Sequence, residues 1–376
     1  MPGIYIHIPF CKQACHYCDF HFSTSLQNKN SFLLALKKEI ELRKDYLNGN
    51  KISTIYFGGG TPSLLSLNEI SDIFDSLTNY FSIDSDAEIT LEANPDDLTK
   101  EKIKELKQTP INRLSIGIQS FFDEDLKLMN RAHDSAEAKN SVKFAQEAGF
   151  KNITIDLIYG IPTLTNENWK KNIATAFSLS VQHISAYCLT VEPKTAFADF
   201  VKKGKVKNVD EQKSAEHFEI MIAEMKINDF SQYEISNFCK EGFYSRHNSS
   251  YWKQENYLGL GPSAHSFDGV SRQWNIANNN FYIQALEKNE ILFEKEILTK
   301  EQRYNEYILT SLRTMWGTDL DYIKNNLGND LLNYCLEEAN PYLSSGNLKQ
   351  TENKLYLTDK GKLFADKIAS DLFKVE

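Results

Sequence analysis

Three cysteines near the N-terminus have the residue type and spacing of a metal or cofactor site. Cys11, Cys15 and Cys18 form the pattern C-x3-C-x2-C within eight residues. A 4Fe–4S cluster normally takes four cysteine ligands, and no fourth cysteine is nearby in the sequence. Three thiolates can therefore hold three corners of a cluster and leave one iron open to another ligand, much as catalytic zinc sites keep an open position.

The alternative is a zinc ion bound by the same cysteines and by His21 or His16, because zinc takes four nitrogen or sulfur ligands. We favour the cluster because the cysteines directly follow a predicted strand, at the end where barrel enzymes gather their chemistry. The other cysteines are isolated, and we interpret them as small buried hydrophobic residues: Cys188, Cys239 and Cys335.

Polar or glycine-rich motifs also follow each of the next five predicted strands. In chain order they are GGGTPS at 58–63, EANP at 92–95, GIQS at 117–120, Asp156 with YGIP at 159–162, and TVEP at 190–193. No lysine follows the glycines of GGGTPS, so a Walker-type phosphate loop is not supported. Six consecutive strand ends with such motifs favour one site served by all six, which is the geometry of a barrel mouth.

The elements that must position these motifs alternate along the first 200 residues. β-branched and aromatic runs predict strands at 4–8, 52–57, 88–91, 113–116, 153–158 and 183–187. Apolar residues at helical spacing predict helices at 32–47, 67–80, 100–106, 135–148 and 168–179. This alternation indicates a parallel sheet with crossover helices, either an open doubly wound sheet or a barrel. Because the motifs occupy all six strand ends, we predict an α/β fold, a partial (β/α)6 barrel of the TIM type.

The pattern changes after about residue 201. A helix is predicted at 210–227, and 230–267 is rich in Tyr, Asn, Ser and Gly, which we interpret as long functional loops. Helices at 301–315, 320–327, 330–343 and 360–373, with a hairpin at 348–357, resemble a winged-helix arrangement. We therefore divide the chain into a barrel (1–230), a loop-rich extension that closes it (231–298) and a smaller, mainly helical C-terminal domain (299–376).

Composition excludes several classes of protein. The chain has 376 residues, of which 41% are hydrophobic, so there is ample material for a core and disorder is excluded as the main state. Its formal charge is −9, which argues against a nucleic-acid partner. We find no run of about 18 apolar residues and no signal peptide, and we therefore expect a cytoplasmic protein.

Longer strings around the motifs resemble one known family. They are YIHIPFCKQACHYCDF, IYFGGGTPS, ITLEANP, NRLSIGIQSF, NITIDLIYGIP, HISAYCLTVEP, YEISNF, RHNSSYW and YLGLGPSAHS. The cysteine triplet followed by GGGTP is similar to the radical S-adenosylmethionine (SAM) superfamily. Over residues 4–270 the strings resemble its oxygen-independent coproporphyrinogen III oxidase-like proteins, and the C-terminal block resembles that family's extra domain.

This resemblance implies a 4Fe–4S cluster on Cys11, Cys15 and Cys18, with SAM bound to the open iron through its amino and carboxylate groups. Backbone of Gly59, Gly60 and Thr61 would approach the methionyl part of SAM, since glycine permits close approach. The other implied SAM contacts are Tyr5, Tyr17, Glu92, Gln119, Arg131, Asp156 and Thr190. Among these, the two carboxylates can accept hydrogen bonds from ammonium or ribose hydroxyl groups, and the guanidinium can hold a carboxylate bidentately.

Two details resemble the heme chaperone branch of this family. The oxidases carry a further cysteine where this chain has Phe20. HNSSYW at 247–252 resembles the heme-binding motif of the chaperones. That resemblance assigns heme binding to His247, Asn248, Tyr251 and Trp252, with the histidine as axial ligand and the two aromatic rings stacked on the porphyrin.

Two further histidines are open to other interpretations. His265, in GPSAHS, is a second candidate ligand for heme iron, and equally a structural imidazole that fixes its loop. His7 lies inside the first predicted strand, and we interpret it as a core residue or as a residue behind the site.

The resemblance therefore implies a heme chaperone that binds heme as cargo and hands it to acceptor hemoproteins, membrane respiratory enzymes among them. Such a protein would reach a membrane only peripherally, through a partner, and a homodimer is a further expectation. The alternative function is oxygen-independent coproporphyrinogen III oxidase, in which a radical derived from SAM drives oxidative decarboxylation. We expect no such decarboxylase activity, and we assign no catalytic residue.

Overall fold

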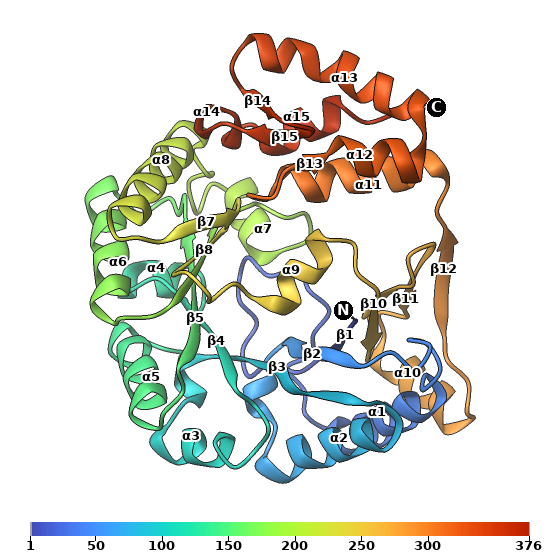
Figure 1. The fold of residues 1–376 in the computed structure, drawn as a ribbon. Coiled ribbons are helices and arrows are strands. Elements are labelled where there is room, and N and C mark those ends of the chain that lie inside the picture. Colours follow the sequence, from blue (N-terminus) through green and yellow to red (C-terminus); the bar gives the residue numbers. More distant parts are fainter. Residues whose placement is uncertain (1, 376) are drawn as a thin grey trace.

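The computed structural model describes residues 2–375, most of which build one curved sheet of 12 strands with helices on its outer face (Figure 1). Six neighbouring strands run parallel in chain order: β1 (Gly3–Ile8), β2 (Ile52–Gly59), β3 (Ile83–Ala93), β4 (Arg113–Gln119), β5 (Asn152–Tyr159) and β6 (His183–Cys188). The sheet stays open, because β12 and β7 are its edge strands and do not pair with each other. The predicted α/β partial barrel is confirmed.

Helices connect the parallel strands on the outside of the curve (Figure 1). They are α1 (Lys29–Leu42), α2 (Leu67–Tyr80), α3 (Lys100–Leu106), α4 (Asp123–Leu128), α5 (Ser135–Glu147) and α6 (Asn166–Ser178), with short 3-10 turns η1 (Pro62–Leu64) and η2 (Pro95–Asp97). Two further helices, α7 (Ala196–Lys202) and α8 (Glu211–Ile227), follow β6. α2 has its predicted bounds and begins at a capping box of Ser66 and Glu69. The predicted end of the first helix at residue 47 is wrong. The helix ends at Leu42, and the chain then turns through left-handed conformations at Asn48 and Gly49.

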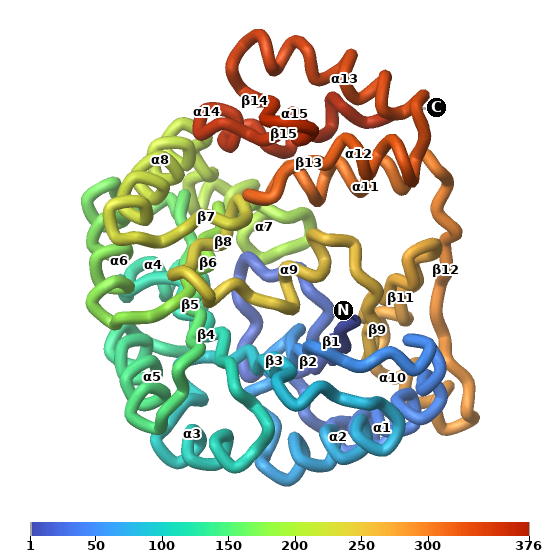
Figure 2. Tube along the Cα trace, viewed as in Figure 1, coloured from blue at the N-terminus to red at the C-terminus, as the bar shows by residue number. Residues whose placement is uncertain are grey.

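Residues 231–298 extend the sheet at both ends. On one side, β8 (Asn237–Cys239) pairs with β6, and β7 (Ser231–Glu234) pairs with β8. On the other side, β9 (Tyr257–Leu260) runs parallel to β1 and is followed by β10 (His265–Phe267), β11 (Ser271–Asn275) and β12 (Phe293–Ile297). Two helices, α9 (Arg246–Trp252) and α10 (Asn279–Glu287), complete this part, and α9 lies between the two groups of strands (Figure 2).

The prediction of long loops at 230–267 is therefore wrong. The segment contains four strands of three or four residues and one helix of seven residues. Elements this short do not complete a recognisable period in the sequence, and their Ser, Asn and Gly residues are typical of loops.

A buried carboxylate ties the extension to the barrel. Glu39 of α1 is completely buried. It accepts hydrogen bonds from the Gly261 N–H at 2.8 Å, from the Asn275 side-chain amide at 2.7 Å and from the Tyr282 hydroxyl at 2.7 Å. Because a buried carboxylate needs such partners, this network fixes the segments around β10 and β11 against α1.

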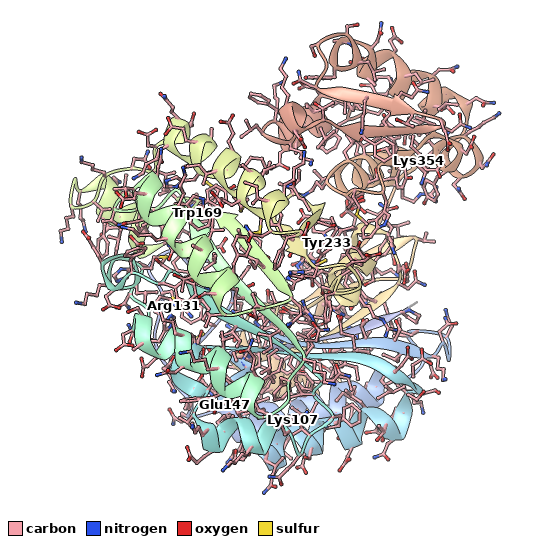
Figure 3. All side chains as sticks on the ribbon, turned by 60° about the vertical axis from the view of Figure 1, so that its left-hand side comes forward. Lys107, Arg131, Glu147, Trp169, Tyr233 and Lys354 are labelled. Atoms are coloured by element: carbon pink, nitrogen blue, oxygen red, sulfur yellow. The ribbon has the colours of Figure 1, made fainter. Side chains whose placement is uncertain are left out.

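The C-terminal block has its own apolar cluster and its own three-stranded sheet of order β13-β15-β14. Its elements are α11 (Lys300–Leu312), β13 (Thr318–Asp319), α12 (Leu320–Tyr322), a π-helical turn (Ile323–Leu327), α13 (Asn329–Ser344), β14 (Leu348–Thr351), β15 (Lys354–Leu357), α14 (Asp359–Lys362) and α15 (Ala365–Asp371). The predicted hairpin is present, whereas the predicted last helix is divided into α14 and α15. The block docks on β7, the strand that carries Tyr233 (Figure 3). The Tyr233 carbonyl accepts the Met315 N–H at 3.0 Å, and Glu234 pairs with Arg313.

No helix in residues 2–375 is long and apolar enough to cross a membrane.

Candidate functional site

The loop that carries the three cysteines leaves the end of β1 and is held against later segments of the barrel. The His16 N–H donates to the Met129 carbonyl at 3.0 Å, and the His16 carbonyl accepts the Phe197 N–H at 2.8 Å. The Asn130 side chain donates to the Ala14 carbonyl at 2.8 Å. The segments after β4 and β6 therefore fix the cysteine loop at the carboxyl ends of the parallel strands.

A cavity of about 460 Å³, here called the cysteine cavity, lies under this loop. It brings together twelve of the thirteen residues predicted for the cluster and for SAM. They are Cys11, Cys15, Tyr17, Cys18, Gly59, Gly60, Thr61, Glu92, Gln119, Arg131, Asp156 and Thr190. These residues come from the carboxyl-terminal halves of the six parallel strands or from the loops that follow them, as the motif pattern predicts.

The three thiols are suited to a cluster that is bound through three of its iron atoms. All three cysteines are free and half-buried. Burial raises the pKa of Cys18 to about 11 and also raises the pKa of Cys11, so their thiolates need positive charge nearby. No three His, Cys, Asp or Glu side chains within residues 2–375 lie close enough together to hold a single metal ion. The thiols could hold a cubane cluster, in which each cysteine binds a different iron.

Arg131 supplies positive charge at the cavity wall. Its Nη1 donates to Cys15 Sγ at 3.3 Å, and its Nη2 donates to Asn94 Oδ1 at 2.6 Å and to the Gly117 carbonyl at 2.9 Å. Its buried Nε has no hydrogen-bond partner among the described residues. A guanidinium held in this way can offset thiolate charge and can still donate to a carboxylate.

Two carboxyl groups face the same cavity from β3 and β5. Burial raises the pKa of Glu92 to about 7, and the nearby Asp156 contributes to that rise. Burial also raises the pKa of Asp156 to about 6. Glu92 accepts hydrogen bonds from the Tyr56 hydroxyl at 2.7 Å and from the Gly59 N–H at 3.2 Å. A cationic ligand would favour the ionised form of both groups.

The glycines after β2 are required by the packing of the chain itself. A Cβ at Gly60 would lie 2.6 Å from the Phe10 carbonyl oxygen, and one at Gly59, which has a φ of +103°, would lie 2.6 Å from the His7 ring. The Gly60 N–H also donates to the Ile8 carbonyl at 2.8 Å. The family resemblance assigns these glycines to close approach of SAM. In the structure, the close approach is between GGGTP and the start of the cysteine loop.

A second cavity of about 620 Å³ lies beside the first, and we call it the aromatic cavity. Its aromatic and histidine lining is Tyr5, His7, Phe20, His21, Tyr251, Trp252, Tyr257, His265 and Phe267. The structure thus places Tyr5, predicted as a SAM contact, here and not in the cysteine cavity. The two cavities share Gly59, Glu92, Asp19 and Phe20 as common wall.

Helix α9 divides the predicted heme-binding residues between the two cavities. Tyr251 and Trp252 line the aromatic cavity, Asn248 lines the cysteine cavity, and His247 lines neither. His247 is buried, with Nδ1 2.8 Å from Thr54 Oγ1 and Nε2 2.8 Å from the Tyr251 hydroxyl. Burial lowers its pKa to about 3, and repulsion from Arg113 adds to this.

His247 therefore does not have the open nitrogen that the prediction of an axial ligand requires. Its ring stacks on Tyr56 with centroids 4.9 Å apart, and Tyr56 in turn donates to Glu92. The sequence could not reveal these contacts, because Thr54, Tyr56 and Glu88 are far from α9 in the chain. Glu88, which accepts the N–H groups of Arg246 and His247 at the start of α9, is a positioning residue that the sequence interpretation missed.

Comparison with known proteins places this geometry in a family. Residues 5–176 match the model of the radical SAM superfamily, and residues 298–364 match that of the HemN C-terminal domain. The heme chaperone HemW of Bacillus subtilis (strain 168) is 36% identical over 371 residues, which cover 98% of both chains. The chain belongs to the HemW family.

Further relatives agree with this placement. The heme chaperones HemW of Mycobacterium tuberculosis (strain H37Rv) and Escherichia coli (strain K12) are 33% and 30% identical, over 98% and 100% of this chain and 94% and 98% of their own. Among solved structures, the radical SAM enzyme coproporphyrinogen III oxidase (HemN) of E. coli has the same fold. Its TM-score is 0.85 at 24% identity, over 99% of this chain and 90% of that one. Membership of the radical SAM superfamily implies a 4Fe–4S cluster and SAM, and the zinc alternative is not supported.

Proposed function

We propose that this chain is a heme chaperone, which binds heme and transfers it to acceptor hemoproteins. The relatives that match over nearly the full length carry that name. The observation that carries the proposal is the aromatic cavity next to the cysteine cavity. Ligand pockets of about 300–1,000 Å³ lined mainly by apolar and aromatic side chains are typical small-molecule sites. This cavity of about 620 Å³ has such rings, together with four carboxylic acid residues and one arginine at its wall.

We assign the two cavities to different ligands. Cys11, Cys15 and Cys18 would hold the cluster, and the remaining residues of the cysteine cavity would bind and orient SAM. Arg131 has an unpaired Nε for the carboxylate of SAM, and Glu92 and Asp156 can accept from its ammonium or ribose groups. The cluster and SAM would supply redox chemistry beside the cargo.

The cargo would lie in the aromatic cavity, against Tyr251 and Trp252. Phe20, which is 68% exposed, stands on the common wall and offers apolar surface to both ligands. The acceptors would include membrane respiratory enzymes. A homodimer, the division at residues 230 and 298, and the individual ligand contacts all remain predictions.

Transfer of heme to an acceptor tests the proposal. The full chain, with its cluster rebuilt without oxygen, is loaded with heme and mixed with the heme-free form of a b-type hemoprotein. We expect the Soret band to change from that of the donor to that of the acceptor, and the acceptor to gain activity. A chain that binds no heme, or that decarboxylates coproporphyrinogen III over many turnovers with SAM and a reductant, would contradict the proposal.

A further inference from the structure

Three histidines line the aromatic cavity, and they differ in whether their ring nitrogens already take part in hydrogen bonds. His7 Nε2 lies 2.8 Å from the His21 carbonyl oxygen, and His7 Nδ1 lies 3.2 Å from the Tyr5 hydroxyl. His21 Nε2 lies 2.7 Å from Asn279 Oδ1. Within residues 2–375, neither ring nitrogen of His265 has a hydrogen-bond partner, and the side chain is exposed at the cavity wall.

His265 is held in place by ring packing. It lies opposite Trp274 in the antiparallel pair of β10 and β11, and the two rings stack with centroids 5.8 Å apart. Because side chains alternate across a strand, Phe267 and Arg272, the pair two residues further along, lie on the same face. Partial desolvation of the ring, with Arg272 contributing, lowers the pKa of His265 and so favours the neutral form, which binds a metal.

Arg272 lies at the same wall and has a side-chain N–H group without a hydrogen-bond partner among the described residues. Its Nη2 donates to Glu306 at 2.9 Å, and its guanidinium lies 5.8 Å from the centre of the Phe267 ring. Its buried Nε has no hydrogen-bond partner among the described residues. Burial raises the pKa of Glu306, so this carboxyl can take up a proton when a second carboxylate approaches the guanidinium.

We propose that His265 is the axial ligand of heme iron in the aromatic cavity and that Arg272 binds a heme propionate. This assignment rests on the proposed function. The ring of His265 offers a free nitrogen on one wall, and Tyr251 and Trp252 offer aromatic surface from α9. The guanidinium can bind a propionate through its free donors. His247 then acts as a positioning residue, which holds the hydroxyl of Tyr251 from behind the cavity wall.

The axial ligand is tested by titrating the full chain, with its cluster rebuilt, with ferric heme. His265→Ala is compared with wild type and with His21→Ala, which removes the other accessible histidine of the same cavity. We expect His265→Ala to lose the imidazole-ligated spectrum and to weaken binding about tenfold or more. Added imidazole should restore the spectrum, and His21→Ala should keep it.

The results that would overturn the ligand assignment differ from those that would overturn the proposed function. If His265→Ala keeps the wild-type spectrum, or if only His21→Ala loses it, the assignment of the ligand is overturned while the proposed function stands. If wild type binds no heme, the proposed function itself fails. Since His265 is exposed and bonded to no side chain, we expect its alanine variant to fold normally.

The propionate contact is tested by comparing heme with heme whose propionates are esterified. Arg272→Gln should weaken the binding of heme about tenfold and leave the binding of the ester unchanged, because only the free acid can pair with the guanidinium. Glu306→Gln is the matched control. It removes the present ion pair but keeps the cation, and it should bind heme as wild type does. An equal loss for heme and ester in Arg272→Gln would overturn this contact.

Discussion

The two cavities share a wall, yet they are built from different parts of the chain and differ in their lining side chains. The cysteine cavity has the more polar lining, and its residues come from the ends of the six parallel strands. The aromatic cavity takes most of its rings and histidines from β1, α9 and the strands β9 and β10. The comparison indicates that the barrel provides the cofactor site, whereas the extension adds most of a second site, which is richer in aromatic rings, beside it.

Loss of a cluster ligand should have the largest effect, and it should affect ligand binding in the cysteine cavity only. Replacing Cys11, Cys15 or Cys18 by serine should abolish the bound iron and acid-labile sulfide, because three corners of the cluster depend on these thiols. SAM binding should be lost with the cluster, and heme binding should remain. Iron and sulfide analysis and the heme spectrum measure the two effects.

Cys188→Ser is the matched control, because Cys188 lines the same cavity but lies outside the triplet. It should keep both the cluster and SAM binding. If a cysteine variant of the triplet lost heme together with the cluster, the separation of the cavities would be wrong.

The next largest effect concerns the residue that lies between the cavities. His247→Ala removes a buried ring, its hydrogen bonds to Thr54 and Tyr251, and its stack on Tyr56. The free energy of unfolding should fall by about 2–4 kcal/mol. Chemical denaturation without heme measures this. His265→Ala, the exposed counterpart, should change stability by less than about 0.5 kcal/mol, and equal stabilities for the two variants would contradict the account.

The pH dependence of SAM binding tests whether Glu92 contacts SAM in the cysteine cavity. The pKa of Glu92 is raised to about 7 in the folded chain, so part of its population is protonated at neutral pH. A ligand that carries sulfonium and ammonium charge favours the ionised carboxylate. SAM affinity should therefore rise about tenfold from pH 6 to pH 8 as this group loses its proton. Equilibrium dialysis at a series of pH values measures the effect.

Glu92→Gln should flatten this profile around pH 7. What would remain is a smaller rise near pH 6 from Asp156, whose pKa is raised to about 6. A profile in the variant that is unchanged from wild type would remove Glu92 from the SAM site.

The smallest effect tests how the extension is anchored. Tyr282→Phe removes one of the three hydrogen bonds that Glu39 accepts and leaves its ring in place. We expect a loss of about 1–2 kcal/mol in the free energy of unfolding. Heme binding should weaken slightly, because β10 and β11 form one wall of the aromatic cavity, while SAM binding should not change. A weakening of SAM binding equal to that of heme binding would contradict the assignment of the two ligands to different cavities.

The cysteine cavity was largely predictable from the sequence. Parallel strands bring their carboxyl ends to one edge, so motifs after six strands must meet, as Glu92, Arg131 and Asp156 do. The aromatic cavity was not predictable in the same way. Its walls depend on β10, a strand of three residues, and on contacts such as His247 to Thr54 that join distant parts of the chain. A motif identified His247, but only burial and hydrogen bonding distinguish it from the open His265.

The most direct test of the central claim, a SAM site and a heme site side by side, is simultaneous binding. The chain with its cluster rebuilt is dialysed against labelled SAM with and without saturating heme, and the Soret spectrum is recorded in the same samples. We predict that heme leaves the amount of bound SAM unchanged and that SAM does not displace heme. Mutual displacement would mean that both ligands compete for one cavity, and it would contradict the account.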